Sequence, residues 1–236
     1  MTVAGPAGPE RVGVIVVAAG SSQRMGDIDK IYALVLGRPL LAWTLDTLEA
    51  DPTVDTVVVA VHRQRLIDAR ALVRDGGWTK VAQVCRGGAT RQDSVREALW
   101  RLGPCDWVAV HDGARPCITA ELLAQGIAAA QATGAAVPAL PVSDTVKRAG
   151  GDLRVVATVD RSGLFLAQTP QVFRHAVLWD AYQQPGEPVS DDAALVERTG
   201  VTVQLFPGSP DNIKVTEPGD LERAERILAA RRVAVR

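Results

Sequence analysis

Hydrophobic residues along the chain follow two alternating patterns. Short continuous runs, rich in valine, predict strands buried on both faces over residues 12–20, 55–62, 80–85 and 106–113. Between these runs, segments with hydrophobic residues along one stripe predict helices over residues 39–51, 63–77, 90–102 and 119–134. Strands that alternate with helices predict an α/β fold, with a mostly parallel sheet joined by right-handed crossovers and flanked by helices.

The alternation breaks between residues 136 and 171. This region contains several short extended stretches and a hairpin tip, "RAGGDLR", at 148–154. A hairpin that cannot cover itself packs on something else, often a second subunit, so we expect an arm. After the arm, helices are predicted over 174–184, 191–199 and 217–232, with a strand over 201–206. We therefore expect a disordered tail over 1–11 and one domain over 12–232.

Composition narrows the class of protein. A chain of 236 residues, 47% of them hydrophobic, can bury one large core. A net charge of −1 argues against a broad basic surface for nucleic acid. The hydrophobic runs are shorter than the roughly 20 residues that span a bilayer, so no membrane partner is expected. Three cysteines without C-x-x-C spacing suit a reduced, cytoplasmic protein and argue against a zinc site.

Polar clusters follow several predicted strands. The first is "VAAGSSQRMG" at 17–26, which fits neither the G-x-G-x-x-G dinucleotide pattern nor the P-loop. The other clusters are "RGGATRQDS" at 86–94, "HDGARP" at 111–116, "SDD" at 190–192 and "DNIKVT" at 211–216. In an open parallel sheet, ligands bind beyond the carboxyl ends of the strands, so these clusters are candidates for one site.

The clusters bring cations to that edge, namely Arg24, Lys30, Arg91, Arg115 and Lys214. A near-neutral protein that gathers cations at one edge is suited to bind an anion. The helix that begins near Thr90 adds free N–H groups, and Arg91 and Ser94 share its first turn. Without a nucleophile motif, this pattern favours phosphoryl or nucleotidyl transfer, which depends on positioning and charge neutralisation.

Structural interpretations of the same residues stay open at this point. Thr90 and Ser190 could serve only as helix caps. Asp112 and Arg115 could form a surface ion pair, and Lys214 could be an outward-facing residue of an ordinary strand.

The motifs also occur as an ordered set that resembles a known family. "AAGSSQRMG", "GGATRQDSV", "HDGARP", "SDTVKR", "VDR", "QTPQVF", "SDDAALVE" and "DNIKVT" are similar to motifs of the bacterial 2-C-methyl-D-erythritol 4-phosphate cytidylyltransferases of the non-mevalonate isoprenoid pathway. The resemblance extends from about residue 12 to 228. It implies a Rossmann-like nucleotidyltransferase fold and a homodimer formed through an extended β-arm. It also implies CMP transfer from CTP to 2-C-methyl-D-erythritol 4-phosphate, with Mg²⁺ held by the triphosphate rather than by protein ligands.

The resemblance assigns roles by matching motif. Arg24 and Lys30 correspond to stabilisers of the transition state, and Arg161 and Lys214 to residues that position the sugar phosphate. The nucleotide would lie along Ala18, Ala19, Gly20, Gly88, Arg91, Ser94, Asp112 and Gly113. The substrate would contact Asp112, Arg115, Thr145, Arg161, Ser190 and Lys214. Because Thr145 and Arg161 lie on the arm, each site would borrow them from the partner subunit.

Two motifs depart from the family pattern, and three other functions are considered. Lys30 is flanked by Asp29 and Ile31 instead of proline and glutamine, and Ala89 replaces a frequent acid or amide. A ribitol-5-phosphate cytidylyltransferase is the nearest alternative, but its usual V-R-P reads Ala114–Arg115–Pro116 here. An NAD-dependent oxidoreductase lacks support because the G-x-G-x-x-G dinucleotide motif is missing. A non-catalytic nucleotide-binding protein would not need the basic residues Arg24, Lys30, Arg161 and Lys214.

Overall fold

Parallel strands form one half of the central sheet in this computed structural model, which describes residues 10–20 and 31–234. The strands β1 (Val12–Ala18), β4 (Val54–Val61), β5 (Val81–Arg86) and β6 (Trp107–Asp112) pair in the order β5-β4-β1-β6. Their valine-rich sequences are almost entirely buried along β1, β4 and β6. The prediction of a mostly parallel sheet is therefore confirmed.

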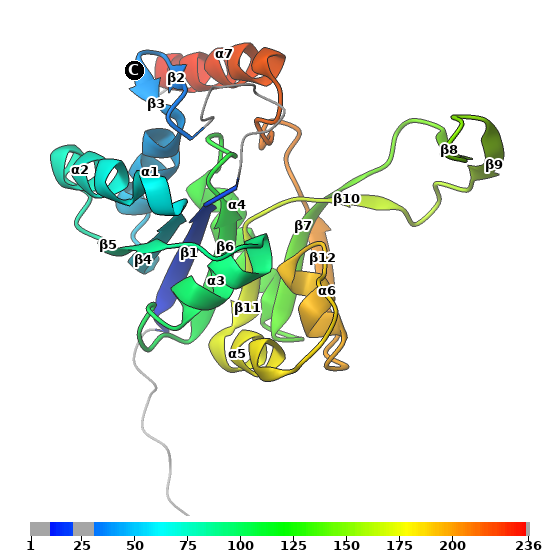
Figure 1. Cartoon of the computed structure of the whole chain (residues 1–236), viewed down its shortest axis with the longest axis horizontal. Helices are drawn as coiled ribbons and strands as arrows, with labels where there is room; N and C mark the ends of the chain where they lie inside the picture. Colours follow the sequence, from blue (N-terminus) through cyan, green and yellow to red (C-terminus); the bar gives the residue numbers. More distant parts are fainter. Residues whose placement is uncertain (1–9, 21–30, 235–236) are drawn as a thin grey trace, which may run out of the picture.

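The other half of the sheet is mixed and uses both ends of the region in which we expected an arm. Strand β11 (Gln171–Arg174) pairs antiparallel with both β6 and β7 (Ala135–Pro141). Strand β7 also pairs with β10 (Phe165–Ala167) and, in parallel, with β12 (Gln204–Pro207). The projecting arm is thus shorter than 136–171. It contains the hairpin of β8 (Val146–Ala149) and β9 (Val155–Val159), which stands away from the body in Figure 1.

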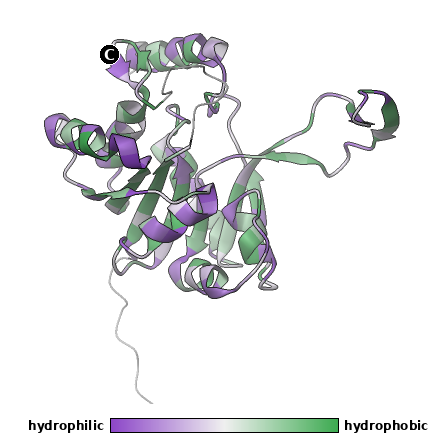
Figure 2. Cartoon of the chain, in the orientation of Figure 1, coloured by the Kyte–Doolittle hydropathy of each residue, from purple (hydrophilic) through white to green (hydrophobic). Residues whose placement is uncertain are grey.

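Helices cover both faces of the sheet. On one face lie α1 (Leu40–Ala50), α2 (Leu66–Gly76) and α4 (Ala120–Ala130), which share a core with the inward side chains of β1 and β4. On the other face lie α3 (Arg91–Leu99), α5 (His175–Gln183) and α6 (Asp192–Glu197). Figure 2 shows the hydrophobic sheet between helices whose ribbons carry many hydrophilic residues. A short 3₁₀ turn, η2 (Arg63–Arg65), precedes α2.

A third hydrophobic cluster lies above the carboxyl edge of the sheet. Helix α7 (Pro218–Ala234) packs there with the hairpin of β2 (Leu34–Val35) and β3 (Arg38–Pro39), and Val215 and Cys117 are buried between them. The sequence pattern predicted α7 but not the β2–β3 hairpin, whose strands have two residues each. Leu36 and Gly37, in the turn of this hairpin, have positive φ. The cluster holds the segment that leads to α7, and that segment carries Lys214.

The described chain begins in contact with the body. Of the expected tail over 1–11, residues 1–9 lie outside the described residues. The backbone N–H of Arg11 donates to Asp106 at 2.8 Å, and Trp107 Nε1 donates to Glu10 at 2.7 Å. Within the described ranges, no helix is both long and apolar enough to cross a membrane.

Candidate active site

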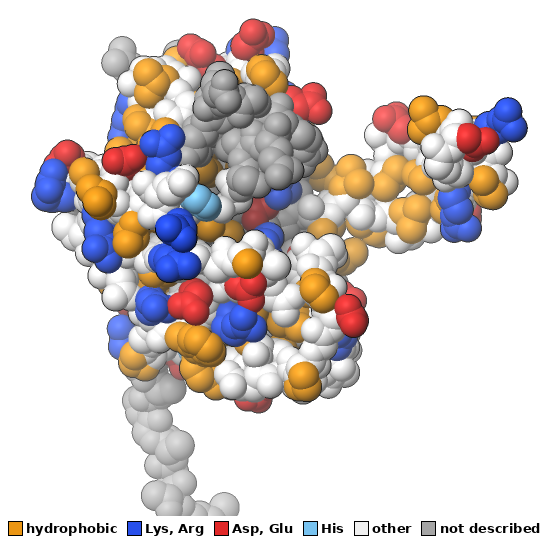
Figure 3. Space-filling model, viewed as in Figure 1, with side chains coloured by type: hydrophobic (Ala, Val, Ile, Leu, Met, Phe, Trp, Pro, Cys, Tyr) orange, Lys and Arg blue, Asp and Glu red, His pale blue; other side chains and the backbone are white. Residues whose placement is uncertain are grey.

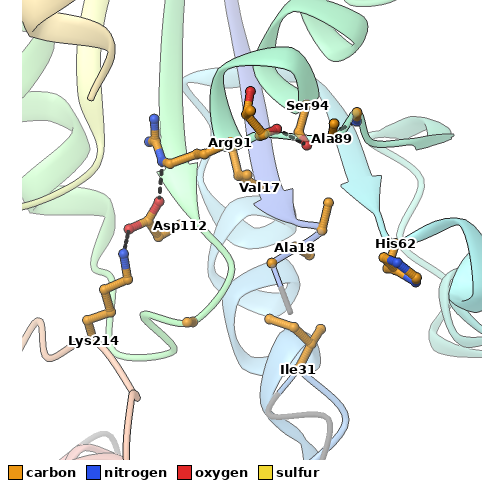
Figure 4. A pocket seen from close by; sticks show the side chains of 14 residues that line it. Val17, Ala18, Ile31, His62, Ala89, Arg91, Ser94, Asp112 and Lys214 are labelled. Atoms are coloured by element: carbon orange, nitrogen blue, oxygen red, sulfur yellow. Dashed lines mark hydrogen bonds and ion pairs between the residues drawn. The ribbon is translucent and has the colours of Figure 1, made fainter. Parts of the chain in front are cut away.

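The carboxyl ends of the parallel strands surround a cavity of about 460 Å³. In the register of the sheet, Ala18 lies beside Val61, and Val17 lies beside Asp112. The residues that follow these strands therefore meet at one edge, as expected for an open α/β sheet. Figure 4 shows Ala18, His62, Ser94 and Asp112, which come from four separate segments of the chain, around the same cavity.

Small residues form one wall of the cavity because larger ones would collide. A Cβ atom added at Gly87 would lie 2.4 Å from the Cβ of Ala19, and one added at Gly88 would lie 2.2 Å from the Cβ of Asp93. The backbone N–H of Gly88 donates to Ser94 Oγ at 3.1 Å, which holds the loop against α3. The loop after β5 therefore packs closely against the end of β1 and the start of α3, and Gly88 and Ser94 form a small-residue slot in the cavity wall.

The loop after β5 is also fixed by the start of α3. Thr90 Oγ1 accepts from the backbone N–H of Asp93 at 3.0 Å, while the Asp93 carboxylate accepts from the backbone N–H of Thr90 at 3.1 Å. This reciprocal pair is a capping box, so Thr90 is a structural cap as well as a residue of the cavity wall. In α6, by contrast, the cap is Asp191 and not Ser190.

A chain of charged groups crosses the floor of the site. Lys214 Nζ lies 2.7 Å from Asp112 Oδ2, and Arg91 Nε lies 3.1 Å from Asp112 Oδ1, as Figure 4 shows. The Nη1 atom of Arg91 also lies 2.6 Å from the carboxylate of Asp192, whose side chain is 1% exposed. The hydroxyl of Tyr182 donates to the other oxygen of Asp192 at 2.6 Å. Asp112 and Asp192 therefore fix Arg91 from two sides.

The charges set the protonation states of this cluster. Burial acts to raise the pKa of Asp112, but Arg91 and Lys214 outweigh it and hold that pKa well below its usual range. Burial likewise acts to lower the pKa of Arg91, while Asp192 and Asp112 raise it above its ordinary value. Asp112 and Arg91 are therefore both charged at neutral pH. Lys214 keeps 41% of its side chain exposed, so its ammonium group can reach a ligand in the cavity.

A second, adjoining cavity of about 260 Å³ shares Arg91, Asp112 and Lys214 with the first. Arg115 and Ser190 line it as well. Arg115 does not pair with Asp112 at the surface: it is buried, and its Nη1 atom donates to the backbone oxygen of Asn212 at 2.6 Å. Its Nε atom is also buried and has no hydrogen-bond partner.

Most of the predicted site residues that lie within the described ranges come together in the structure. The first cavity is lined by Ala18, Ala19, Gly20, Gly88, Arg91, Ser94, Asp112 and Lys214. Gly113 lines neither of the two cavities, and its N–H donates to the backbone oxygen of Val17 at 2.9 Å. Arg24 and Lys30 lie outside the described residues.

Two of the nominated residues lie elsewhere. Thr145 and Arg161 are exposed on the arm and line neither cavity in their own chain. Arg161 bends back to donate to the backbone oxygen of Ser143 at the base of the arm. A site that uses these two residues requires an arm from another chain.

Sequence reasoning missed several residues of the site. His62 lines the first cavity directly after β4, and its position at a strand end was the available signal. Asp192 was noted only as part of a helix start, yet it fixes Arg91. Thr169 was noted only within the motif "QTPQVF", yet it lines the second cavity. Local patterns place these residues near strand or helix ends but do not identify their distant partners.

The described residues offer no ready metal site. Over these ranges, no group of three or more His, Cys, Asp or Glu side chains could hold a metal ion. Asp112 reaches both cavities, but its two oxygens already accept from Lys214 and Arg91. This donor set does not fit a protein-held Mg²⁺.

A sheet edge that joins a small-residue slot to cations from three separate segments defines an α/β nucleotidyltransferase. Comparisons with known proteins identify the kind. The family model described as 2-C-methyl-D-erythritol 4-phosphate cytidylyltransferase matches residues 12–230. A protein of that name from Dehalococcoides mccartyi strain CBDB1 is 42% identical over 219 residues, covering 93% of this chain and 96% of the relative. Another from Bacillus cytotoxicus is 41% identical over 223 residues, covering 93% and 98%.

Solved structures agree with the sequence relatives. The 2-C-methyl-D-erythritol 4-phosphate cytidylyltransferase from Thermus thermophilus superposes with a TM-score of 0.75 at 35% identity, covering 93% of this chain and 99% of that one. The 4-diphosphocytidyl-2C-methyl-D-erythritol synthase from Anaerococcus prevotii reaches a TM-score of 0.80 at 28% identity, covering 94% and 97%. The chain belongs to the 2-C-methyl-D-erythritol 4-phosphate cytidylyltransferase family and is an enzyme of the nucleotidyltransferase class.

Proposed function

We propose that this protein transfers CMP from CTP to 2-C-methyl-D-erythritol 4-phosphate. A phosphate oxygen of the sugar phosphate attacks the α-phosphorus of CTP, and the bond from that phosphorus to the bridging oxygen of the β-phosphate breaks. Pyrophosphate leaves with the bonding pair, and 4-diphosphocytidyl-2-C-methyl-D-erythritol remains. The observation that carries the proposal is the placement of Lys214, Arg91 and Asp112 where the narrow cavity meets its neighbour.

The nucleotide would occupy the first cavity. Its cytosine would enter the slot beside Gly88 and Ser94, whose small side chains line this part of the cavity. The ribose and phosphates would then extend along Ala18–Gly20 toward Asp112. This direction brings the α-phosphate to the boundary between the two cavities.

The sugar phosphate would occupy the second cavity, where Arg115, Lys214 and Ser190 offer donors. Two polyanions repel each other, so the reaction needs positive charge between them more than it needs a nucleophile. Lys214 would exchange part of its ion pair with Asp112 for the incoming phosphate. The roles of Arg24 and Lys30 as transition-state stabilisers stay predictions, as does Mg²⁺ arriving on the CTP phosphates.

We further propose a homodimer in which each arm completes the site of its partner. Exposed hydrophobic residues lie along the arm and its base, including Val155, Val156, Phe165 and Leu166. Figure 3 shows hydrophobic side chains along the stalk that joins the arm to the body. Burying them against a second copy would also deliver Thr145 and Arg161 to the second cavity. The three free cysteines suit a reducing cytoplasm.

Product analysis with CTP, Mg²⁺ and each candidate acceptor tests the activity. We expect 4-diphosphocytidyl-2-C-methyl-D-erythritol and pyrophosphate in equal amounts, with negligible turnover of ribitol 5-phosphate. Lys214→Ala should lower kcat/KM by about 10²–10³ because it removes a preorganised charge contact. Arg226→Ala, which removes an exposed cation on α7, is the matched control. Turnover of ribitol 5-phosphate alone would overturn the proposed substrate.

Mixed dimers test the shared arm. Arg161→Ala and Lys214→Ala proteins should each be strongly impaired alone. Mixed together, they should form heterodimers in which one site has an intact arm and an intact body, so activity should return. Arm residues that act within their own chain would give no recovery.

A further inference from the structure

His111 is a buried residue that neither the mechanism above nor the family motifs assign a task. It lies in β6 directly before Asp112 and is 0% exposed. Its Nε2 atom is 3.1 Å from the backbone oxygen of Arg115, and its Nδ1 atom is 3.1 Å from Thr169 Oγ1. The ring therefore joins the end of β6, the turn that follows it and the loop before β11.

The partners determine which nitrogen carries the proton. A carbonyl oxygen can only accept, so Nε2 must donate to Arg115. In the neutral ring Nδ1 is then an acceptor and takes the hydroxyl proton of Thr169. The Thr169 oxygen in turn accepts from the backbone N–H of Asp112 at 3.0 Å. The hydrogen bonds run in one direction, from Asp112 through Thr169 and His111 to Arg115.

A second branch ties this chain to the loop that carries Lys214. Asn212 Nδ2 donates to the backbone oxygen of Thr169 at 2.7 Å, and the backbone oxygen of Asn212 accepts from Arg115 Nη1 at 2.6 Å. Asn212 is itself 1% exposed. The branches close a ring of contacts around three segments, and each segment holds a group that lines the second cavity.

We propose that His111, as the neutral Nε2–H tautomer, is a positioning residue that aligns Asp112, Arg115 and the Lys214 loop for the phosphate of the acceptor. This inference rests on the proposed function, because the second cavity is taken to hold the acceptor. His111 acts through Asp112 and Arg115 and does not touch the substrate.

The surroundings keep the ring neutral. Burial lowers the pKa of His111 from 6.5 to about 4. Two charged groups act on it: Asp112, which raises the pKa, and Arg115, which lowers it. Protonation of Nδ1 would turn it from an acceptor into a donor facing the Thr169 hydroxyl. The direction of the whole chain would then be lost.

Three substitutions test separately the two hydrogen bonds that the His111 ring makes. His111→Phe keeps a flat ring but removes both bonds. His111→Asn places an amide oxygen near the position of Nδ1, and His111→Gln places an amide N–H near the position of Nε2. The matched control is His175→Phe, since His175 stacks on Trp179 at the start of α5, away from both cavities.

Steady-state kinetics with each substrate varied is the first test. His111→Phe should lower kcat/KM for the sugar phosphate by about 10- to 100-fold, because buried partners are left unsatisfied. The KM for CTP should stay within about threefold, since Gly88 and Ser94, which would hold the base, lie outside this network. His111→Asn and His111→Gln should each recover part of the loss, and His175→Phe should match the wild type. Equal losses toward both substrates, or no difference among the three variants, would show that His111 only fills space.

Nitrogen-15 NMR of the imidazole groups is the second test and does not depend on the reaction. The His111 signals, assigned by their loss in His111→Phe, should show Nε2 protonated and Nδ1 unprotonated from pH 5.5 to 8. Protonation at Nδ1 within that range would overturn the network even if the enzyme is active. If wild-type enzyme fails to transfer CMP while the tautomer is as expected, the proposed function fails and the network stands.

Discussion

Replacing Asp192 with asparagine removes the charge that fixes Arg91 from behind the site. Asp192 is 1% exposed, and one of its oxygens lies 2.6 Å from Arg91 Nη1. Its other oxygen accepts from the Tyr182 hydroxyl at 2.6 Å. Asparagine has the same shape, so packing is kept and the amide can still bond to Tyr182. Arg91 would be left with Asp112 as its remaining described carboxylate partner.

The size of the effect follows from the burial of the pair. Removing one partner of a buried ion pair costs about 3–5 kcal/mol. Arg91 keeps 27% of its side chain exposed and a second carboxylate, so water and Asp112 offset part of this cost. We therefore expect Asp192→Asn to lower the free energy of unfolding by about 2–3 kcal/mol. In a chain of 236 residues this corresponds to a fall in Tm of about 4–12 °C.

Thermal unfolding followed by circular dichroism measures this effect. Asp180→Asn is the matched control, because Asp180 is an exposed residue of α5 and the change of chemistry is the same. Arg91 lines the nucleotide cavity, so Asp192→Asn should also raise the KM for CTP. Equal melting temperatures for the two variants would refute the view that Asp192 supports Arg91.

Two more changes test the slot and the buried histidine. Gly87→Ala places a methyl group 2.4 Å from the Ala19 Cβ, so it should destabilise the protein by about 1–3 kcal/mol and weaken CTP binding by calorimetry. Gly219→Ala, with nothing within 4 Å, should do neither. Burial lowers the pKa of His111 from 6.5 to about 4, so this histidine takes up a proton at a higher pH in the unfolded chain than in the folded protein. Stability should therefore decline by about 3 kcal/mol between those values in urea titrations, and His111→Phe should lack this contribution.

Local patterns predicted the parts of the fold that local physics decides. The valine-rich run from Val12 made β1 recognisable, because only a strand buried on both faces needs such a sequence. Thr90 and Asp93 stand at the spacing of a capping box, and α3 begins between them. The strands β7 and β11 were harder to assign, since their burial depends on antiparallel pairing with each other and with β6. Pairing across such separations leaves no local signal.

The candidate site divides in the same way. Positions after the strands were predictable, because parallel strands end at a common edge. Partners were not: the pattern allowed a surface pair of Asp112 with Arg115, but Asp112 binds Lys214 and Arg91 instead. Arg115 turns to a backbone oxygen of Asn212, which is 97 residues away in the chain. Burial and folding geometry, which the sequence does not display, determine these choices.

The carboxylates change how the anion site must work. The sequence suggested a gathering of cations, but the described residues that line the two cavities place Asp112 and Asp191 among Arg91, Arg115 and Lys214. Asp112 and Asp191 offset part of the positive charge that these described residues bring, and a phosphate must compete with Asp112 for Lys214. That competition ties acceptor binding to the position of Asp112. Because Asp112 is held through Thr169 by His111, a buried ring outside the cavities can govern how the sugar phosphate is bound.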